Sequence, residues 1–164
     1  MLTQARPHHE RLWLATVDPT SSSDLGFLYG TLILRLEEPH TNISHTELPP
    51  WDKHVAFVAG RPYGLRHWII QTPCFSKGVC YVSPQNEVGI YIIPQARREG
   101  IGTWTLAYLT ARHSNLVANV AKTNLASFCF FARNGFVLEA ELPTQFVFKG
   151  YHHVTAPQLR SSKQ

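Results

Sequence analysis

The alternation of apolar and polar positions along the chain predicts a mixture of strands and helices. Apolar residues alternate with polar ones through residues 11–16, as in a strand with one buried face. After a loop rich in helix-capping residues, leucines recur at helical spacing from Leu25 to Leu36. Gly26 and Gly30 lie inside this expected helix, and we interpret their G-x-x-x-G spacing as close helix packing.

The rest of the chain predicts three more helices and six more strands. The expected helices span residues 51–59, 102–113 and 125–133. The expected strands span residues 65–71, 79–83, 87–93, 116–120, 136–141 and 145–151. Residues 76–78 and 84–86 are rich in turn formers, which indicates an antiparallel meander. This order predicts an α+β fold: a mixed, mostly antiparallel sheet of about six to seven strands flanked by about four helices.

Length and composition favour one globular domain. The chain has 164 residues, 44% hydrophobic and 16% charged, which suffices to enclose a single core. We expect one domain over residues 1–164, with 157–164 as a loose tail. No apolar run approaches the roughly 18 residues needed to cross a bilayer, and no apolar segment follows a basic start. The sequence therefore predicts a cytoplasmic protein that does not enter a membrane.

Charge and cysteine content limit the ligands and metal ions that the protein is expected to bind. The net charge of +4 and the pI near 9.1 favour anionic ligands. The cationic residues form no dense run, so nucleic acid is possible but not indicated, and a phosphate-bearing cofactor suits the charge equally well. The three cysteines include no C-x-x-C pair, and the paired histidines lack metal-ligand spacing. We expect reduced thiols, Cys129 packed in the core, and no metal.

A glycine-containing loop lies where an expected strand gives way to a helix, at residues 94–103. Gly100 and Gly102 allow backbone amides to turn toward an anion at the positive end of the helix. A pyrophosphate fits such a loop. A P-loop would need Gly-Lys-Ser/Thr, and a dinucleotide-binding fingerprint would need glycine or alanine at Thr105. A plain turn before a helix is the alternative interpretation.

The spacing Arg97-x-x-Gly100-x-Gly102 resembles the acyl-coenzyme A signature of the GNAT superfamily of N-acetyltransferases. A later block resembles that family's second motif, in which Asn and Ser precede an aromatic residue, a basic residue and Gly-Phe. Its residues are Asn124, Ser127, Phe131, Arg133, Gly135 and Phe136. The order of strands and helices is similar to the GNAT fold over nearly the whole chain.

The resemblance implies acetyl-coenzyme A as the cofactor. In the family, the strands before and after the loop and its helix splay apart around the pantetheine arm; here these are residues 87–93 and 116–120. An amide near Ile92 would polarise the thioester carbonyl. The implied cofactor-binding residues are Ile92, Ile93, Arg97, Arg98, Glu99, Gly100, Ile101, Gly102, Thr103, Asn124, Ser127, Phe131 and Arg133.

Direct attack by an amine on the thioester requires a base, because the amine must lose a proton first. Glu87 is our candidate, since it begins a strand beside the expected cleft; the alternative is a carboxylate on an exposed turn. The family usually supplies a tyrosine as general acid where Phe131 stands. Ser127 is the second catalytic candidate, and Tyr91, Tyr151 or a water are left open for the same role.

Acceptor recognition is expected between residues 42 and 57, where the family's variable segment lies. Its pattern weakly resembles members that acetylate amino sugars carried on nucleotides. Trp51 is expected to stack on a base or sugar, and Glu47 or His54 are alternatives to His45 for orienting the amine. The predicted acceptor-binding residues are His45, Trp51, Tyr91 and Asn119.

The sequence hypothesis is therefore an N-acetyltransferase that acts on a primary amine of a small molecule. A protein amine or an amino-modified nucleobase is the second hypothesis for the acceptor. The third is a non-catalytic acyl-coenzyme A sensor, which the phenylalanine at position 131 favours. The length of the acyl chain is left open, and so is the choice between a monomer and a homodimer.

Overall fold

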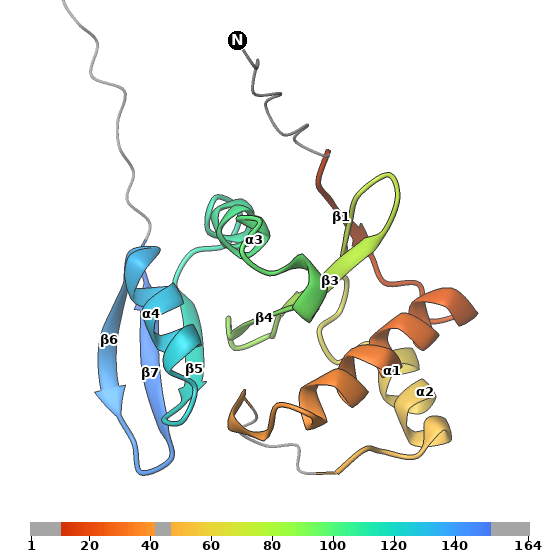
Figure 1. Cartoon of the computed structure of the whole chain (residues 1–164), viewed down its shortest axis with the longest axis horizontal. Coiled ribbons are helices and arrows are strands. Elements are labelled where there is room, and N and C mark those ends of the chain that lie inside the picture. Colours follow the sequence, from red (N-terminus) through yellow and green to blue (C-terminus); the bar gives the residue numbers. More distant parts are fainter. Residues whose placement is uncertain (1–10, 42–46, 152–164) are drawn as a thin grey trace, which may run out of the picture.

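The computed structural model describes residues 11–41 and 47–151, and within them it contains the expected order of seven strands and four helices (Figure 1). The strands are β1 (Trp13–Thr16), β2 (His67–Gln71), β3 (Ser76–Val82), β4 (Val88–Ile92), β5 (Leu116–Ala121), β6 (Phe136–Glu141) and β7 (Gln145–Gly150). The helices are α1 (Ser22–Leu36), α2 (Trp51–Ala59), α3 (Ile101–Thr110) and α4 (Leu125–Arg133), with short 3-10 turns at η1 (Pro39–Thr41) and η2 (Pro94–Ala96). The expected tail at 157–164 lies outside the described residues.

The strands form two antiparallel sheets. One has the order β1-β2-β3-β4, and the other has the order β5-β7-β6. The predicted meander is confirmed, because β2 pairs with β3 and β3 pairs with β4, both antiparallel. A parallel bridge between Glu87 and Val117 joins the two sheets. The fold is thus the predicted α+β arrangement, with seven strands divided at the boundary between β4 and β5.

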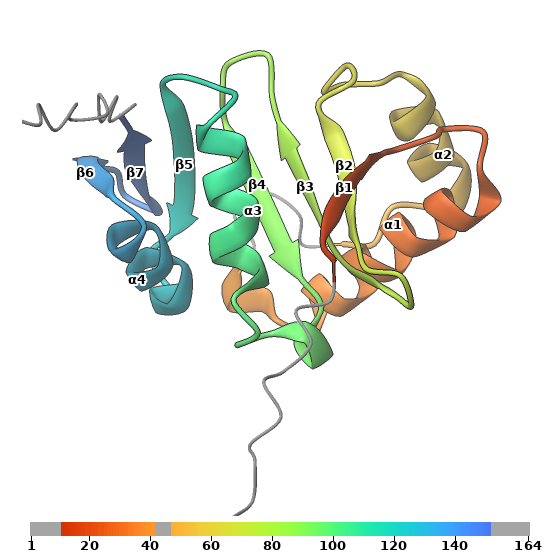
Figure 2. The ribbon, with the colours of Figure 1, turned by 90° about the horizontal axis from the view of Figure 1, so that it is seen from above.

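Helices cover both faces of the four-stranded sheet. Leu25 and Leu28 of α1 and Val58 of α2 pack on Ile69 and Val79 on one face. The apolar side of α3 packs on the other face, in a cluster that continues into the second sheet. Figure 2 shows α3 crossing in front of β4, with α1 and α2 on the opposite face of the four-stranded sheet.

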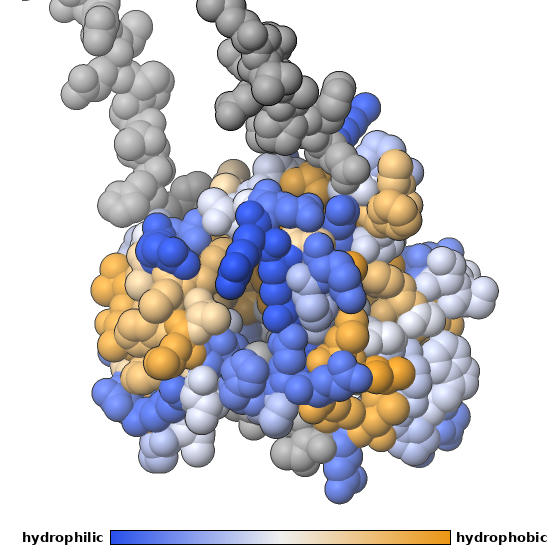
Figure 3. Space-filling view, in the orientation of Figure 1, coloured by the Kyte–Doolittle hydropathy of each residue, from blue (hydrophilic) through white to orange (hydrophobic). Residues whose placement is uncertain are grey.

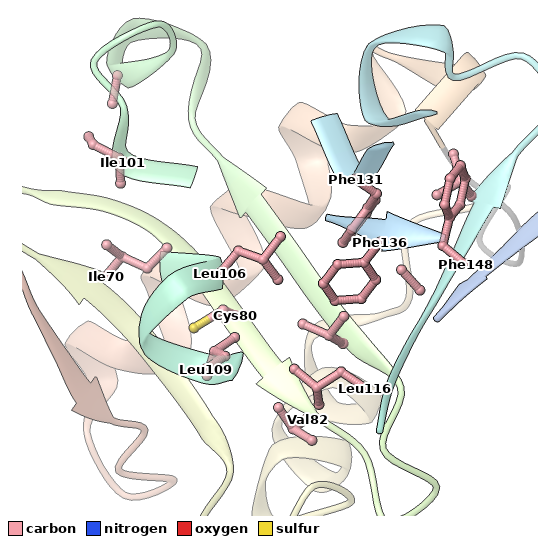
Figure 4. Packing of buried hydrophobic residues seen from close by; sticks show 14 residues of the cluster. Ile70, Cys80, Val82, Ile101, Leu106, Leu109, Leu116, Phe131, Phe136 and Phe148 are labelled. Atoms are coloured by element: carbon pink, nitrogen blue, oxygen red, sulfur yellow. The ribbon is translucent and has the colours of Figure 1, made fainter. Parts of the chain in front are cut away.

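A single apolar cluster spans the division between the sheets. Leu106 and Leu109 of α3 contribute to it together with Cys80 of β3, Leu116 of β5 and Phe148 of β7, all 1% exposed or less (Figure 4). Because close packing makes such a core resist deformation, the two sheets hold a fixed relative position.

The sequence misplaced the start of β3. Residues 76–78 were expected as a turn, but they are the first three residues of the strand. Gly78 explains the difference, since a Cβ at this position would collide with the carbonyl oxygen of Tyr91 on β4. Glycine therefore indicates close approach of two strands here rather than a turn.

Two expectations about packing are wrong. A Cβ built on Gly26 or on Gly30 of α1 would meet no atom within 4 Å, so the G-x-x-x-G spacing does not mark close helix contact. Cys129, expected in the core, is exposed on α4. Among residues 11–41 and 47–151, no helix combines the length and the apolar character that crossing a bilayer requires.

Gly26→Ala should raise the free energy of unfolding by about 0.5–1 kcal/mol. Glycine inside a helix costs backbone entropy, and the open space allows a methyl group without collision. Gly78→Ala should instead destabilise the protein by about 1–3 kcal/mol through overpacking. Urea denaturation measures both changes. Destabilisation by Gly26→Ala would mean that α1 does contact another element at this glycine.

Candidate active site

The two sheets meet at one end of β4 and β5. The Val117 N–H donates to the Asn86 carbonyl at 2.9 Å, beside the Glu87 bridge. Further along, the Ile93 N–H donates to Lys77 of β3 at 3.0 Å. Alternate residues of a strand direct their backbone groups to opposite edges, so Ile92 directs its N–H toward β5. Ile92 and Ile93 were both predicted to bind the cofactor. Only Ile92 directs its N–H to the division between the sheets, because the Ile93 N–H is bonded to β3.

The residues that follow β4 form a loop with left-handed backbone conformations that leads into α3. Arg98 and Gly100 both have left-handed backbone conformations, with φ of 67° and 78°. Gly100 is the N-cap of α3, and no side chain caps the helix there. The first helical hydrogen bond runs from Trp104 N–H to the Gly100 carbonyl, so the amides of residues 101–103 have no acceptor within the helix. Left-handed residues before such amides create a concave site for phosphate oxygens.

Arg97, the first residue of the motif, points its side chain away from this loop. Its guanidinium forms a bidentate ion pair with Glu38 just after α1, with both N–O distances 2.9 Å. Its Nε also donates to the Ile92 carbonyl at 3.1 Å. The hydrogen bond with Glu38 raises the pKa of Arg97. Arg97 therefore fixes the end of β4 against the residues after α1, and the next residue, Arg98, is exposed.

Helix α4 of the second half of the molecule contacts the first turn of α3 through Phe130. The Asn124 side chain accepts from the Ser127 N–H at 3.1 Å and so caps α4. A Cβ on Gly102 would lie 3.2 Å from the Phe130 ring, which shows that α3 and α4 meet closely. Arg133, in the last turn of α4, is exposed and donates to the Cys129 carbonyl at 3.3 Å.

Phe131 lies in an aromatic cluster. Its ring centroid is 5.2 Å from Phe136 and 6.3 Å from Phe148, and only 7% of the residue is exposed. A tyrosine hydroxyl at this position would need a polar partner inside an apolar cluster. The phenylalanine is therefore well accommodated as packing, and its ring offers no proton.

Glu87 lies half-buried where the two sheets join, and its N–H donates to the Ser83 hydroxyl at 3.0 Å. By strand alternation its side chain shares a face with Gly89 and Tyr91, and Tyr91 packs in the cluster beneath α1. The Tyr91 hydroxyl is buried and has no hydrogen-bond partner among the described residues. Burial raises the pKa of Tyr91, and the carboxylate of Glu38 raises it further.

Asn119 of β5 lies on the same side of the division. Val117 and Glu87 are bridge partners, so they share a face, and Asn119 lies two residues after Val117. Gln145 donates to its side-chain oxygen at 3.0 Å, which leaves the Asn119 side-chain N–H groups to donate. The structure thus brings Glu87, Tyr91 and Asn119 to one face of the division.

The other predicted acceptor residues lie on or near α2. Trp51 is 46% exposed at the start of α2 and meets Tyr29 edge to face at 5.1 Å. His54 is only 4% exposed, and its Nε2 donates to the Leu25 carbonyl at 3.1 Å. His54 thus joins α2 to α1. His45 lies outside the described residues. In the described part of the chain, no three His, Cys, Asp or Glu side chains gather as metal ligands.

An aromatic group that was not predicted from the sequence consists of Tyr63, His67 and Tyr81. The rings of Tyr63 and Tyr81 stack at 4.1 Å with 9° between their planes, and His67 meets Tyr63 edge to face at 5.2 Å. Burial raises the pKa of both tyrosines, and the Glu87 carboxylate also raises it. Burial lowers the pKa of His67 to about 4, with a further contribution from His54.

The surface around the division is polar. In Figure 3, hydrophilic side chains run down the middle of the face shown, and an apolar area lies on the side of the three-stranded sheet. Exposed apolar residues of that sheet include Val137 and Leu138 of β6. The central band thus suits a charged or strongly polar ligand.

Acid should destabilise the protein through His67. Above pH 6.5 this histidine is neutral in both the folded and the unfolded chain. As the pH falls from about 6.5 to about 4, the unfolded chain binds a proton that the folded chain does not. The free energy of unfolding should then fall by up to about 1.4 kcal/mol per pH unit. Urea titrations of wild type and His67→Gln at several pH values measure the effect. The same pH dependence of the free energy of unfolding in both proteins would contradict it.

No family model matches this chain, and no curated protein sequence does. Solved structures match its fold. A spermidine N-acetyltransferase from Vibrio cholerae, in complex with CoA and spermine, has a TM-score of 0.67 and 15% identity over 84% of this chain and 92% of that chain. A ribosomal α-N-protein acetyltransferase in complex with coenzyme A has a TM-score of 0.61 and 18% identity over 84% of this chain and 90% of that chain. A GNAT-family acetyltransferase from Streptococcus pneumoniae has a TM-score of 0.63 and 14% identity over 85% of this chain and 98% of that chain. The chain therefore has the GNAT acetyltransferase fold.

Proposed function

We propose that this protein is an N-acetyltransferase that transfers an acetyl group from acetyl-coenzyme A to a primary amine of a small-molecule acceptor. The observation that carries the proposal is the division between β4 and β5, which are bridged at Glu87 and Val117 and have the uncapped start of α3 nearby. A strand edge and an anion-binding loop in this relation suit a cofactor with both an amide-containing arm and a pyrophosphate. The fold shared with acetyltransferases supports the same function.

The residues present fit this cofactor. The amides of residues 101–103, which have no intrahelical acceptor, would hold the pyrophosphate, and Arg98 and Arg133 would add positive charge. Ile92 presents its N–H to the same division. When bound, acetyl-coenzyme A supplies the acetyl group as a thioester. Asn124 remains a proposed contact through its side-chain nitrogen, because its oxygen already caps α4.

Glu87 is the proposed base. The attacking amine is an ammonium ion at neutral pH, and only its neutral form has the lone pair that attacks. Glu87 lies half-buried beside the bridge, on the face that also carries Tyr91 and Asn119. Its carboxylate would take the proton, directly or through a water, and Asn119 would donate to an acceptor oxygen.

The leaving thiolate cannot receive a proton from residue 131, because this residue is a phenylalanine and not a tyrosine. Ser127 lies one turn before Phe131 on α4 and remains the proposed acid. A thiolate also departs without help, because thiols are much stronger acids than alcohols. The buried Phe131 favours a second candidate function, a sensor that binds acyl-coenzyme A without turnover.

The acceptor is proposed to be a small amine. The exposed Trp51 supports stacking on a base or sugar, and an amino-sugar nucleotide is one such acceptor. The fold neighbours named above act on a polyamine and on a protein N-terminus, so spermidine and a peptide amine belong in the same assay. An amino-modified nucleobase is the remaining alternative for this basic protein, and strong salt dependence of binding would favour it.

Acetyl-coenzyme A should bind the wild-type protein, and Gly100→Ala should weaken binding about tenfold or more. Alanine at φ 78° strains the loop and turns its amides away from the phosphate site. Gly64→Ala is the matched control, because Gly64 also has a positive φ of 60° and no neighbour within 4 Å. Calorimetry measures both. Absence of binding to the folded wild-type protein would refute the proposed function.

Glu87→Gln should lower kcat about 100-fold to 10,000-fold at neutral pH and remove the acidic limb of the pH profile, because glutamine accepts no proton. Glu139→Gln, which removes only an exposed ion pair with Lys149, should leave both unchanged. Free-thiol release with the best acceptor of the amine panel gives the rates. An unchanged pH profile in Glu87→Gln would exclude Glu87 as the base.

A further inference from the structure

Tyr81 of β3 lies across the neighbouring strand β4. Its partner in the antiparallel register is Gly89, and a Cβ on Gly89 would overlap the outer edge of the Tyr81 ring. The ring atoms nearest that position are Cε1 and Cζ, followed by the hydroxyl oxygen. The absent side chain of Gly89 therefore allows Tyr81 to reach over β4, toward the division between the sheets.

The position of Tyr81 is fixed from both sides. The Tyr63 ring stacks on it at 4.1 Å, and Gly89 supports it from the backbone of β4. An aromatic ring that covers a glycine across a strand pair is a stabilising arrangement in sheets. Tyr81 is neither fully buried nor fully exposed, and its hydroxyl lies on the edge of the ring that extends over Gly89.

The hydroxyl shares its surroundings with Glu87. Both residues lie on the α1 side of β4, since Gly89 follows Glu87 by two positions and Tyr81 covers Gly89. Burial raises the pKa of Tyr81, and Tyr63 and the Glu87 carboxylate raise it further. The phenol is therefore protonated at neutral pH, and its oxygen retains lone pairs that accept hydrogen bonds.

We propose that Tyr81 is an acceptor-binding residue, whose hydroxyl oxygen accepts an N–H of the attacking amine while Glu87 takes the proton that the amine must lose. The proposal rests on the proposed acetyl transfer. It assigns the acceptor as a primary ammonium, because two oxygens on one face of the sheet suit a compact cation with several N–H donors.

The proton and bond changes balance without a further reagent. One proton of the ammonium passes to Glu87 and then to solvent, which frees the lone pair. The nitrogen then forms the C–N bond as the C–S bond breaks, and the electron pair of that bond leaves on sulfur. The second proton leaves nitrogen and ends on the thiol. Tyr81 keeps its own proton throughout and holds the nitrogen in place.

Tyr81→Phe tests the hydroxyl while it keeps the ring over Gly89. We expect the KM for the best amine of a panel of spermidine, a free-N-terminus peptide and an amino-sugar nucleotide to rise about tenfold or more. This is the loss expected for a hydrogen bond to a charged group. The affinity for acetyl-coenzyme A should not change. Tyr108→Phe is the control, since Tyr108 lies on α3 beneath Arg112, on the opposite side of the sheet.

The outcomes separate this proposal from the proposed function. If wild type binds and transfers acetyl but Tyr81→Phe stays within twofold of its KM, Tyr81 does not bind the amine. An equal loss in Tyr108→Phe would also overturn the proposal. If wild type fails to bind acetyl-coenzyme A, the proposed function itself fails.

A second measurement uses the unmodified protein, in case the variant does not fold. Tyrosine labelled with carbon-13 at Cζ reports on the phenol, and the Tyr81 signal can be assigned from its stacked neighbour Tyr63 by a Tyr63→Phe spectrum and nuclear Overhauser contacts. Adding spermidine to the protein saturated with coenzyme A should shift the Tyr81 signal more than that of Tyr108. A shift at Tyr108 alone, or none at Tyr81 at saturating amine, would overturn the proposal.

Discussion

The parallel bridge between Glu87 and Val117 is the constraint on which the rest of the structure depends. It joins two antiparallel sheets at one end of β4 and β5, and beyond it each strand pairs within its own sheet. Backbone groups such as the Ile92 N–H then face the division instead of a neighbouring strand. Because backbone donors need partners, a divided sheet suits an extended ligand that supplies them. The cofactor arm of an acetyltransferase is such a ligand.

The division is maintained from both faces. On one face, α3 packs into a core shared by both sheets, so the strands cannot close by sliding together. On the other, Arg97 binds Glu38, and the Thr123 hydroxyl donates to the His40 carbonyl at 2.9 Å, which ties η1 to the second sheet. The residues after α1 therefore contact both halves. These links hold the loop before α3 and the face that carries Glu87, Tyr91 and Asn119 on the same rigid scaffold.

Local sequence patterns predicted the positions of helices and strands better than they predicted which residues contact one another. The bounds of α2 and α4 agree with the sequence prediction, because Pro50 and Gly60 flank α2, and Asn124 caps the start of α4. Gly78 and Gly26 were misinterpreted, because a glycine's role depends on what approaches it in space. Tyr81 was missed for a related reason: its function depends on the cross-strand partner Gly89, and the register becomes visible only once β3 is known to begin at Ser76. His45 and the segment around it lie outside the described residues.

The central claim is that the division between the sheets, together with the amides at the start of α3, binds acetyl-coenzyme A. Hydrogen exchange of individual backbone amides, measured by NMR with and without coenzyme A, tests it most directly. The account predicts that protection rises at Ile92 and at residues 101–103, while protection in strands β1, β2 and β3 stays unchanged. Protection that stays constant at those amides in the presence of saturating coenzyme A would contradict the account.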